Sequence, residues 1–357
     1  MFLAYQELKK ERARFILVAI VIVLVGYLTF FLTGLAYGLA TSYTRGLEQW
    51  GASGIILNEN ANDTLARSLI HEPEYKDIVG ADTALLGVSN ATVLGERADD
   101  VAVFGVAPGD FYTPVICEGE SSRDAQHVVV SDELKKIGIK LGDTLAFKGI
   151  KDAAYVVSGF TRNATYQTAP IVYMQLDEWR TFAAEASGMT GMRDATTVNG
   201  IVTRGEFDAG KLADTGLTWQ PMKDFYFKLP GYKPQVLTFS LMIGFLIGIA
   251  SFVLAIFMYI LTLQKKGIFG VLKAEGVPNG YIGMSVLLQA LILSVTGLAV
   301  SLAAALATAY ILRDKVPFLV NWYLFGGIVA VFIICAVIGS LASVRAVTKI
   351  DPVEAIG

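Results

Sequence analysis

The chain has 357 residues, of which 54% are hydrophobic and only 17% are charged, against about 25% charged residues in ordinary soluble domains. Its net charge of −3 argues against nucleic acid as a partner, because nucleic-acid-binding domains carry a basic surface. Cys117 falls in an external segment and Cys335 inside an apolar run, so they cannot form the disulfide framework of a small secreted domain.

The chain begins with the mixed basic and apolar segment "MFLAYQELKKERAR". Lys9, Lys10, Arg12 and Arg14 are interspersed with apolar residues, a mixture typical of a helix lying among lipid headgroups. We predict a cytoplasmic interfacial helix at residues 1–14, with an ordinary solvated terminus as the alternative.

Four apolar runs contain no Asp, Glu, Lys or Arg, and each exceeds the roughly 20 residues that cross a hydrocarbon core. They predict transmembrane helices at residues 15–40, 236–263, 281–312 and 316–344. The first run is longer than the roughly 7–15 apolar residues of a secretion signal. It is therefore predicted to remain as an anchor in the lipid bilayer.

Lysine and arginine gather in the short segments on one side of these helices. They are Lys9, Lys10, Arg12 and Arg14 before the first helix, Lys265, Lys266 and Lys273 between the second and third, and Arg345 and Lys349 after the fourth. Such an excess marks the cytoplasmic side. We predict a multi-pass protein of the cell membrane with both termini in the cytoplasm, including a tail at residues 345–357. A turn at 313–315 and residues 41–235 are expected outside.

Residues 41–235 are predicted to form an extracellular α+β domain. Short β-type runs such as "TALLGVSNATVLG" and "APIVYMQL" alternate with turns, and "DELKKIGI" and "LDEWRTFAAEA" have helical spacing. The predicted fold class is therefore an α-helical membrane protein with four transmembrane helices and this domain inserted between helices 1 and 2. His71 and His127 have no partners at catalytic or zinc-binding spacing. We therefore predict that the chain has no catalytic residue and no metal site, and that it is not an enzyme.

The sequence also limits which energy source the protein could use for active transport. The four apolar runs hold none of the ionisable residues that ion-coupled carriers place in the membrane. The chain also lacks the G-x-x-x-x-G-K-[ST] motif of a P-loop that binds ATP. No intrinsic cofactor is predicted, and active work would depend on ATP bound by a partner subunit.

A short segment between the second and third helices, residues 264–280, is predicted to contain a cytoplasmic helix. Ile268, Phe269, Val271 and Leu272 recur at helical spacing, and Gly276 and Pro278 are placed to end the helix. Two interpretations remain open: an interfacial helix that turns the chain, or a coupling helix seated in a cytoplasmic ATPase. At the C-terminus, Asp351, Pro352 and Glu354 have the spacing of a capped helix start.

The sequences "FGVLKAEGVPNGYI" and "DPVEAI", together with the four-helix layout, resemble the FtsX/MacB-type permeases of ABC transporters. The stretches "VVVSDELKKIGIKLGDTLAF" and "APIVYMQLDEWRTF" are similar to the outer domain of that family. The resemblance implies a permease homodimer, docked on two copies of a cytoplasmic ABC ATPase subunit, that works by mechanotransmission.

The resemblance also implies which residues contact the ATPase. These are Ile268, Phe269, Leu272, Lys273 and Glu275, with support from residues 351–354. Many relatives carry an acidic residue where this chain has Lys266, which leaves the detailed contact open.

Two G-x-x-x-G motifs lie in the predicted transmembrane helices, Gly34 with Gly38 and Gly244 with Gly248. This spacing lets helix backbones approach closely in lipid. We interpret both motifs as dimer packing sites, while noting that glycine is common in transmembrane helices for other reasons.

Among FtsX/MacB-type permeases, the chain is most similar to the HrtB-like heme exporter permeases of Gram-positive bacteria, through "MFLAYQELKKERARFILV" and "KAEGVPNGYI". That resemblance implies heme as the transported ligand and a Gram-positive source. Tyrosine can ligate heme iron, and apolar rings could form a slot for a porphyrin. The candidate cargo residues are Tyr232, Tyr166, Tyr37, Tyr43, Tyr226, Met242 and Phe239. For each tyrosine, an anchor at the membrane interface is the alternative.

Two other functions fit the same family. FtsX-like members regulate a cell-wall hydrolase across the membrane, and related permeases confer resistance to antimicrobial peptides or sense them. A hydrolase regulator is expected to expose an apolar patch on the distal part of the outer domain. The aromatic stretch "WQPMKDFYFKLPGYKP" beside the second helix favours an apolar cargo instead.

Overall fold

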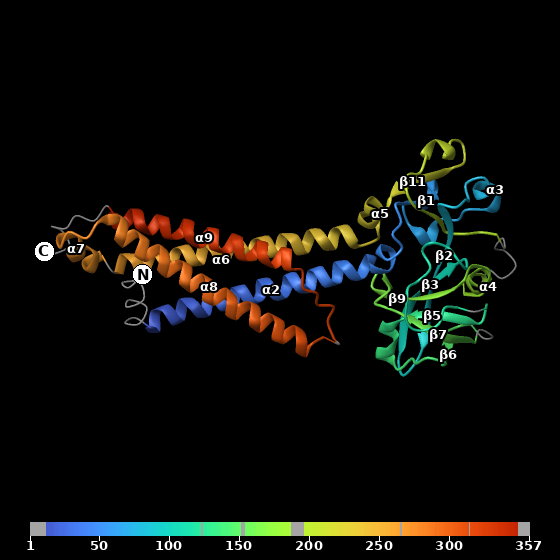
Figure 1. Cartoon of the computed structure of the whole chain (residues 1–357), viewed down its shortest axis with the longest axis horizontal. Helices are drawn as coiled ribbons and strands as arrows, with labels where there is room; N and C mark the ends of the chain where they lie inside the picture. Colours follow the sequence, from blue (N-terminus) through green and yellow to red (C-terminus); the bar gives the residue numbers. More distant parts are fainter. Residues whose placement is uncertain are drawn as a thin grey trace. The chain divides into compact units, whose positions relative to one another are not determined.

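The computed structural model describes residues 12–122, 124–150, 154–186, 196–264, 266–313 and 315–348. The chain forms two compact units, Met1–Gly38 with Val236–Gly357 and Leu39–Gln235 (Figure 1). The predicted interfacial helix falls mainly on residues 1–11, and the C-terminal capping motif on residues 351–354. Both lie outside the described residues.

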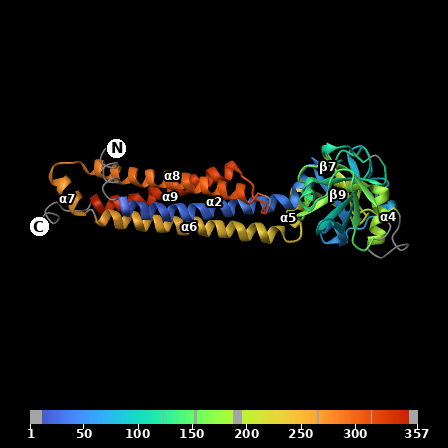
Figure 2. The same ribbon diagram turned by 90° about the horizontal axis from the view of Figure 1, so that it is seen from below.

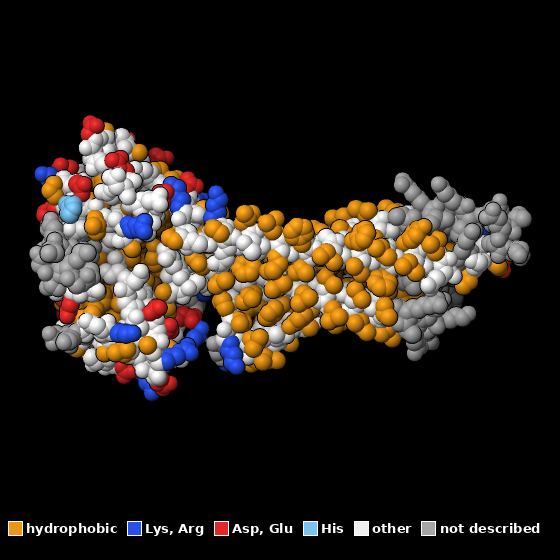
Figure 3. Space-filling view, turned by 180° about the vertical axis from the view of Figure 1, so that it is seen from behind, with side chains coloured by type: hydrophobic (Ala, Val, Ile, Leu, Met, Phe, Trp, Pro, Cys, Tyr) orange, Lys and Arg blue, Asp and Glu red, His pale blue; other side chains and the backbone are white. Residues whose placement is uncertain are grey.

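The first unit is a bundle of helices that lie side by side (Figures 1 and 2). Its helices are α2 (Arg12–Glu48), α6 (Tyr232–Gln264), α7 (Lys266–Ala274), α8 (Asn279–Ile311) and α9 (Trp322–Thr348). In the described part of the chain, four helices, α2, α6, α8 and α9, are long and apolar enough to cross a membrane. Hydrophobic side chains cover the face of the bundle seen in Figure 3. The prediction of four transmembrane helices is confirmed.

The helix ends differ from the predicted spans. α2 continues past residue 40 to Glu48, and α9 begins at Trp322 instead of Val316. Asn321 sets this start, because its side-chain oxygen accepts hydrogen bonds from the backbone N–H groups of Tyr323 (3.0 Å) and Leu324 (3.2 Å). The connection between α8 and α9 is therefore longer than the predicted turn at 313–315.

Small residues bring α2 and α8 close together. A Cβ atom at Gly26 would meet the side chain of Ser301, and one at Gly297 would lie 2.6 Å from a methyl carbon of Ile22. The Ser301 hydroxyl donates to the carbonyl of Gly297 (2.7 Å) and lies 3.0 Å from that of Val23. Close backbone approach of this kind is how helices associate in lipid, where the hydrophobic effect does not drive them together.

The second unit is an α+β domain built on one mixed sheet. Its strand order is β11-β1-β10-β2-β3-β9-β5-β7-β4, with β6 pairing to β2 and β7 and β8 pairing to β9. The strands are β1 (Gly54–Asn58), β2 (Thr83–Leu94), β3 (Ala98–Val106), β4 (Ile116–Gly119), β5 (His127–Ser131), β6 (Thr144–Phe147), β7 (Tyr155–Thr161), β8 (Thr165–Tyr166), β9 (Ala169–Gln175), β10 (Gly200–Thr203) and β11 (Leu217–Pro221). The predicted α+β class is confirmed.

Short helices complete this domain. They are α3 (Glu72–Tyr75), α4 (Leu176–Ala186), α5 (Met222–Lys228) and the 3₁₀ turns Glu59–Ala61, Leu65–Arg67, Asp132–Ile137 and Ala209–Leu212. The segment "DELKKIGI", predicted as helical, forms one of these 3₁₀ turns. Gly138 ends it in the left-handed conformation at φ 88°, which glycine adopts without steric cost.

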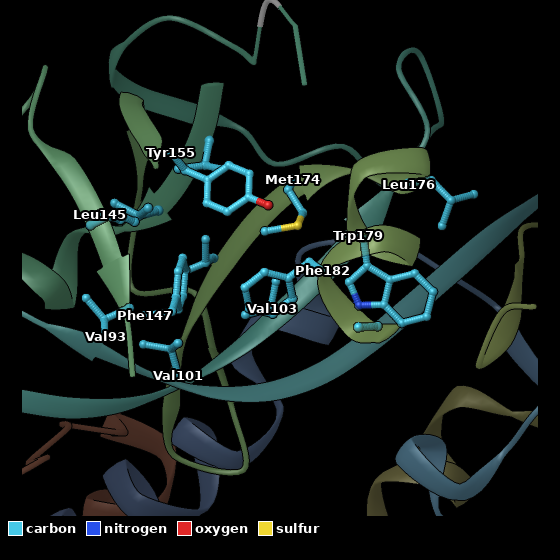
Figure 4. Close-up of a cluster of buried hydrophobic side chains, with 14 of the residues drawn as sticks. Val93, Val101, Val103, Leu145, Phe147, Tyr155, Met174, Leu176, Trp179 and Phe182 are labelled. Carbon is cyan, nitrogen blue, oxygen red and sulfur yellow. The ribbon is translucent and has the colours of Figure 1, made fainter. Parts of the chain in front are cut away.

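The sheet has a hydrophobic core on each face, because successive side chains of a strand point to opposite sides. Val103 lies in one core and its neighbour Phe104 in the other. The first core is covered by α4 through Trp179 and Phe182 (Figure 4). The second core includes Leu47 at the end of α2, together with residues of α5. The helix α2 therefore contributes residues to the bundle and, through Leu47, to the second core of the α+β domain.

The indole of Trp179 packs against the sheet where two strands carry glycine. Cβ atoms at Gly87 of β2 and Gly105 of β3 would collide with it. Trp179 is fully buried, and its Nε1 donates to the Ser89 hydroxyl at 3.0 Å. The two glycines thus provide the space for the largest side chain of this core.

We predict that Gly87→Val destabilises the α+β domain by about 1–3 kcal/mol, because the new side chain overpacks the site of Trp179. The matched control is Gly80→Val, since Gly80 is exposed and has nothing within 4 Å of its Cβ position. Thermal unfolding of the purified full-length protein, followed by tryptophan fluorescence, measures the difference. Equal melting temperatures for the two variants would contradict the packing described here.

Candidate functional site

Four aromatic residues of the α+β unit gather where α2 ends and α6 begins. Tyr43 lies on α2, Tyr226 and Phe227 on α5, and Tyr232 is the first residue of α6. The ring centroid of Tyr232 lies 5.7 Å from that of Tyr43 and 5.7 Å from that of Phe227. We call these four residues the aromatic cluster.

A glycine turn brings α5 and α6 against α2. Gly231 has φ +81°, and a Cβ atom there would lie 3.3 Å from the Tyr43 hydroxyl. Any other residue at this position would be strained. Its added Cβ would also crowd Tyr43, so Gly231 helps to keep Tyr43 and Tyr232 in contact.

The cluster is attached to the sheet through the backbone of α2. The N–H of Gln167 donates to the carbonyl of Tyr43 at 3.1 Å, and the N–H of Thr168 to that of Ser42 at 3.3 Å. Tyr226 and Tyr232 are half-buried and pack against the core that contains Leu47. Phe227 is 54% exposed. The cluster therefore has a fixed inner side and an exposed apolar edge.

A carboxylate, which the sequence did not suggest, accompanies the cluster. Glu48 is exposed at the last position of α2, and its Oε1 accepts a hydrogen bond of 2.6 Å from the Thr44 hydroxyl. Burial, and next the Glu48 carboxylate, raise the pKa of Tyr226. Nothing in the spacing of Glu48 indicates this proximity, because α2 and α5 are far apart in the chain.

Tyr166, one of the candidate cargo residues, is a core residue. It is only 4% exposed, and its ring packs edge-on against Phe104 at 5.4 Å. Gln167 Nε2 donates to its hydroxyl at 3.2 Å. Burial raises the pKa of Tyr166, which disfavours the phenolate that would bind iron best. Its position fits packing better than ligation.

The remaining candidate cargo residues belong to the helical unit. Tyr37 on α2 and Phe239 and Met242 on α6 are each half-buried. Of the predicted set, the structure thus brings Tyr43, Tyr226 and Tyr232 together and adds Phe227 and Glu48.

The predicted coupling segment forms α7, and its apolar residues divide between two faces. Phe269 is 1% exposed and packs in a cluster with Ile282 and Val286 at the start of α8; Leu272 is partly buried against the same cluster. Ile268 and Val271 are instead 53% and 46% exposed. Phe269 and Leu272 anchor α7 to the bundle, while its outward face is apolar.

The end of α7 follows the sequence expectation. Gly276 adopts φ +85°, and its N–H donates to the carbonyl of Lys273 at 3.0 Å. The N–H of Val277 closes the turn onto Leu272, also at 3.0 Å. Lys273 is half-buried and Glu275 is exposed. The exposed side chains here include Ile268 and Val271 on α7 and Glu275 directly after it, and Val271 was not among the predicted contacts.

The two glycine motifs have different surroundings. Cβ atoms at Gly34 and Gly38 would collide with Phe318 and with the carbonyl of Pro317, both in the α8–α9 connection of the same chain. Gly244 and Gly248 on α6 are exposed, with nothing within 4 Å of their Cβ positions. Packing within one chain accounts for the first motif. Dimerisation stays a prediction, and only the α6 motif is open to a partner.

We predict that Tyr166→Ala lowers the stability of the protein by about 3–5 kcal/mol, as removal of a buried aromatic ring usually does. Tyr43→Ala removes a half-exposed ring and is expected to cost about 1 kcal/mol. Thermal unfolding of both purified full-length variants checks this order. If Tyr43→Ala destabilises as much as Tyr166→Ala, the aromatic cluster is part of the structural core.

Comparison with known proteins agrees with this architecture. Residues 240–352 match the family of the FtsX-like permease C-terminal domain. Over its whole length the chain is 25% identical to the hemin transport system permease protein HrtB of Staphylococcus haemolyticus (strain JCSC1435), covering 99% of that protein. HrtB of Staphylococcus epidermidis (strain ATCC 12228 / FDA PCI 1200) is also 25% identical, and an ABC transporter permease of Mycobacterium tuberculosis (strain CDC 1551 / Oshkosh) is 23% identical; the chain covers 99% of each.

Among solved structures, the extracellular domain of the ABC-type transporter YknZ overlaps 48% of this chain and 99% of its own length, with 14% identity and a TM-score of 0.33. A similarity that low adds nothing to the assignment, which rests on the sequence matches. The predicted resemblance to FtsX-like and HrtB-like permeases is confirmed by those matches. Residues 240–352 thus match the FtsX-like permease C-terminal domain, and the chain as a whole is similar to HrtB permeases of ABC transport systems.

Proposed function

We propose that this permease exports heme, or a planar amphipathic molecule like it, from the membrane of a Gram-positive bacterium. The aromatic cluster carries the proposal, because it presents tyrosine hydroxyls and aromatic faces where two membrane helices enter the α+β domain. The relatives named as hemin transport permeases support the same cargo class. In this proposal heme is a transported ligand and not a resident cofactor.

Tyr43 and Tyr232 are the proposed cargo contacts, with their ring centroids 5.7 Å apart. Tyrosine is an established ligand of heme iron, and Phe227 offers an exposed apolar face beside it. Tyr166 is not retained as a contact, since it is 4% exposed within the core. Glu48 is proposed to accept a hydrogen bond from a tyrosine of the cluster when cargo is bound.

ATP hydrolysis is assigned to a separate ABC ATPase subunit that would dock on the cytoplasmic face of α7. The exposed pair Ile268 and Val271 is the proposed contact, because apolar side chains that face water mark interaction surfaces. Phe269 would transmit a movement of the docked ATPase to the helical bundle, since it is buried against the start of α8. Two ATPase copies and a permease homodimer complete the proposed assembly.

The sidedness of the assembly is proposed from charge. The three short segments on the side of α7 hold nine Lys and Arg residues, whereas the short connection between α8 and α9 on the other side holds two, Arg313 and Lys315. By the positive-inside rule, α7 and both termini are cytoplasmic and the α+β domain is extracellular. Cargo would then leave the membrane on the side where the aromatic cluster lies.

Titration of the purified permease with hemin, in the presence and absence of its neighbouring ATPase, tests the cargo assignment. We expect a saturable, shifted Soret band that Tyr43→Phe combined with Tyr232→Phe weakens by at least about tenfold in Kd, equivalent to about 1.4 kcal/mol. Tyr166→Phe is the matched control and is expected to bind hemin normally. If an intact, ATPase-active complex gives no shifted band, heme is not the cargo, and antimicrobial peptides or a cell-wall hydrolase become the candidates.

Substitution of the outward face of α7 tests the docking assignment. Ile268→Asp with Val271→Asp is expected to abolish co-purification of the ATPase while the permease remains folded, because it places charges in the apolar contact. Asn279→Asp, an exposed position at the start of α8, adds a charge nearby and serves as the control. Retention of the ATPase by the double variant would place the docking surface elsewhere.

A further inference from the structure

The connection between α8 and α9, residues 312–321, carries two cations next to the end of an apolar span. Arg313 and Lys315 are both exposed. The Arg313 guanidinium lies over the ring of Tyr310, with its central carbon 5.5 Å from the ring centroid. With Asp314 between the two cations, the connection has a net charge of +1. It therefore presents positive charge where α8 ends.

Large side chains flank these cations on both helices, and we call them the interfacial residues. Tyr310 and Ile311 end α8 and are 73% and 77% exposed. Trp322 and Tyr323 begin α9 and are 65% and 94% exposed. Leaving side chains of this size in water forgoes the free energy of burial, whereas Tyr and Trp are favoured at the level of lipid headgroups. The interfacial residues therefore mark the depth at which α8 and α9 leave the hydrocarbon.

Backbone hydrogen bonds give the connection a defined shape. The N–H of Lys315 donates to the carbonyl of Leu312 at 2.8 Å, which closes a turn directly after α8. Further along, the N–H of Leu319 donates to the carbonyl of Gly34 on α2 at 3.1 Å. A ligand of Arg313 and Lys315 would therefore meet a backbone that is already ordered, which lowers the entropic cost of binding.

The lipid headgroup layer matches both properties of this surface. It supplies phosphate for the cations and an amphipathic environment for the interfacial residues. Free phosphate would pair with the cations alone and would leave four large side chains in water. The dimer motif that is open to a second copy, Gly244 with Gly248, lies on α6 and not on α8 or α9. A phospholipid is therefore the occupant that accounts for charge and exposure together.

We propose that Arg313 and Lys315 bind the phosphate of an anionic phospholipid at the depth marked by the interfacial residues. Both side chains donate charge-assisted hydrogen bonds to phosphate oxygens, and basic residues at the end of a membrane span attract anionic lipid. The headgroup of phosphatidylglycerol carries a net negative charge. In phosphatidylcholine, an ammonium group balances the phosphate. The site is therefore expected to select phosphatidylglycerol over phosphatidylcholine.

Trp322 provides a fluorescent probe of the lipids beside the connection. The other three tryptophans, Trp50, Trp179 and Trp219, belong to or pack against the cores of the α+β domain. Bromine atoms on a lipid acyl chain quench tryptophan fluorescence only at short range. Lipids brominated near the carbonyl end of the chain therefore report which headgroup type gathers around Trp322. The measurement depends neither on the cargo nor on an ATPase.

The full-length permease is reconstituted into phosphatidylcholine bilayers that contain a small, equal fraction of brominated phosphatidylglycerol or brominated phosphatidylcholine. We expect phosphatidylglycerol to quench Trp322 at least about twofold more, because the cations enrich anionic lipid around the connection. Arg313→Gln with Lys315→Gln should remove this difference and leave quenching by phosphatidylcholine unchanged. Lys148→Gln with Lys211→Gln removes the same charge from exposed positions of the α+β domain and should keep the difference. Trp322→Phe gives the background to subtract.

Three results would overturn the proposal. Equal quenching by the two brominated lipids in the wild-type protein would show that the connection does not select an anionic headgroup. No quenching by either lipid would show that protein, and not lipid, covers Trp322. Sodium phosphate is also compared with sodium chloride at equal ionic strength. If phosphate alone abolishes the preference, the cations bind the inorganic anion instead of a phospholipid. None of these results bears on heme export.

Discussion

Close approach of α2 to its neighbours is the constraint on which the helical unit depends. In hydrocarbon, helices are joined by van der Waals contact and hydrogen bonds, so each interface must be tight to be stable. Glycine meets this need at Gly26, Gly34 and Gly38 on α2 and at Gly297 on α8. Serine adds polar contacts without bulk, as Ser301 does against the carbonyl of Val23. Without these small residues, α8 and the α8–α9 connection could not lie on the backbone of α2.

The same helix is also part of the α+β domain. Leu47 is fully buried in the core beneath the sheet, and the backbone of Tyr43 is bonded to Gln167. The helix runs from Arg12 to Glu48, so its first part belongs to the helical unit and its last turns to the α+β unit. In α6, by contrast, Tyr232 contributes to the aromatic cluster while the following turns remain exposed. Along their apolar spans, 33% of the α2 residues are buried within this chain, against 6% of those in α6.

Much of the fold was predictable, because the signals were long and physically simple. Uncharged apolar runs predicted the four membrane helices, and β-type runs between turns predicted the sheet. The start of α9 was not predictable from the run that begins at Val316, because its first residues are apolar for a different reason: Phe318 packs on Phe31 of α2. A hydropathy pattern cannot distinguish a side chain that faces lipid from one that faces another helix.

The candidate sites show the same limit. Spacing alone could not separate Phe269 from Ile268, because both are apolar neighbours and only packing reveals which one is buried. Spacing also could not distinguish Gly38, whose Cβ position is blocked by Pro317 of the same chain, from Gly248, whose Cβ position has nothing within 4 Å. Tyr43, Tyr226 and Tyr232 were identifiable as aromatic residues near the helix ends. Glu48 was missed and the burial of Tyr166 was not foreseen, because burial and contacts between distant parts of the chain cannot be read from the local sequence.

The uninterrupted course of α2 sets a fixed rotational phase between its glycine contacts within the helical unit. An α-helix turns by about 100° for each residue, so the angle between the face of Gly26, which meets Ser301, and the face of Gly38, which meets Pro317, depends on the number of residues between them. Insertion or deletion of one residue would turn one face away from its partner by roughly a quarter turn. Substitutions on the exposed side of this segment are tolerable, but its length is not free to vary. In this chain the number of residues between Gly26 and Gly38 is therefore constrained together with their identity.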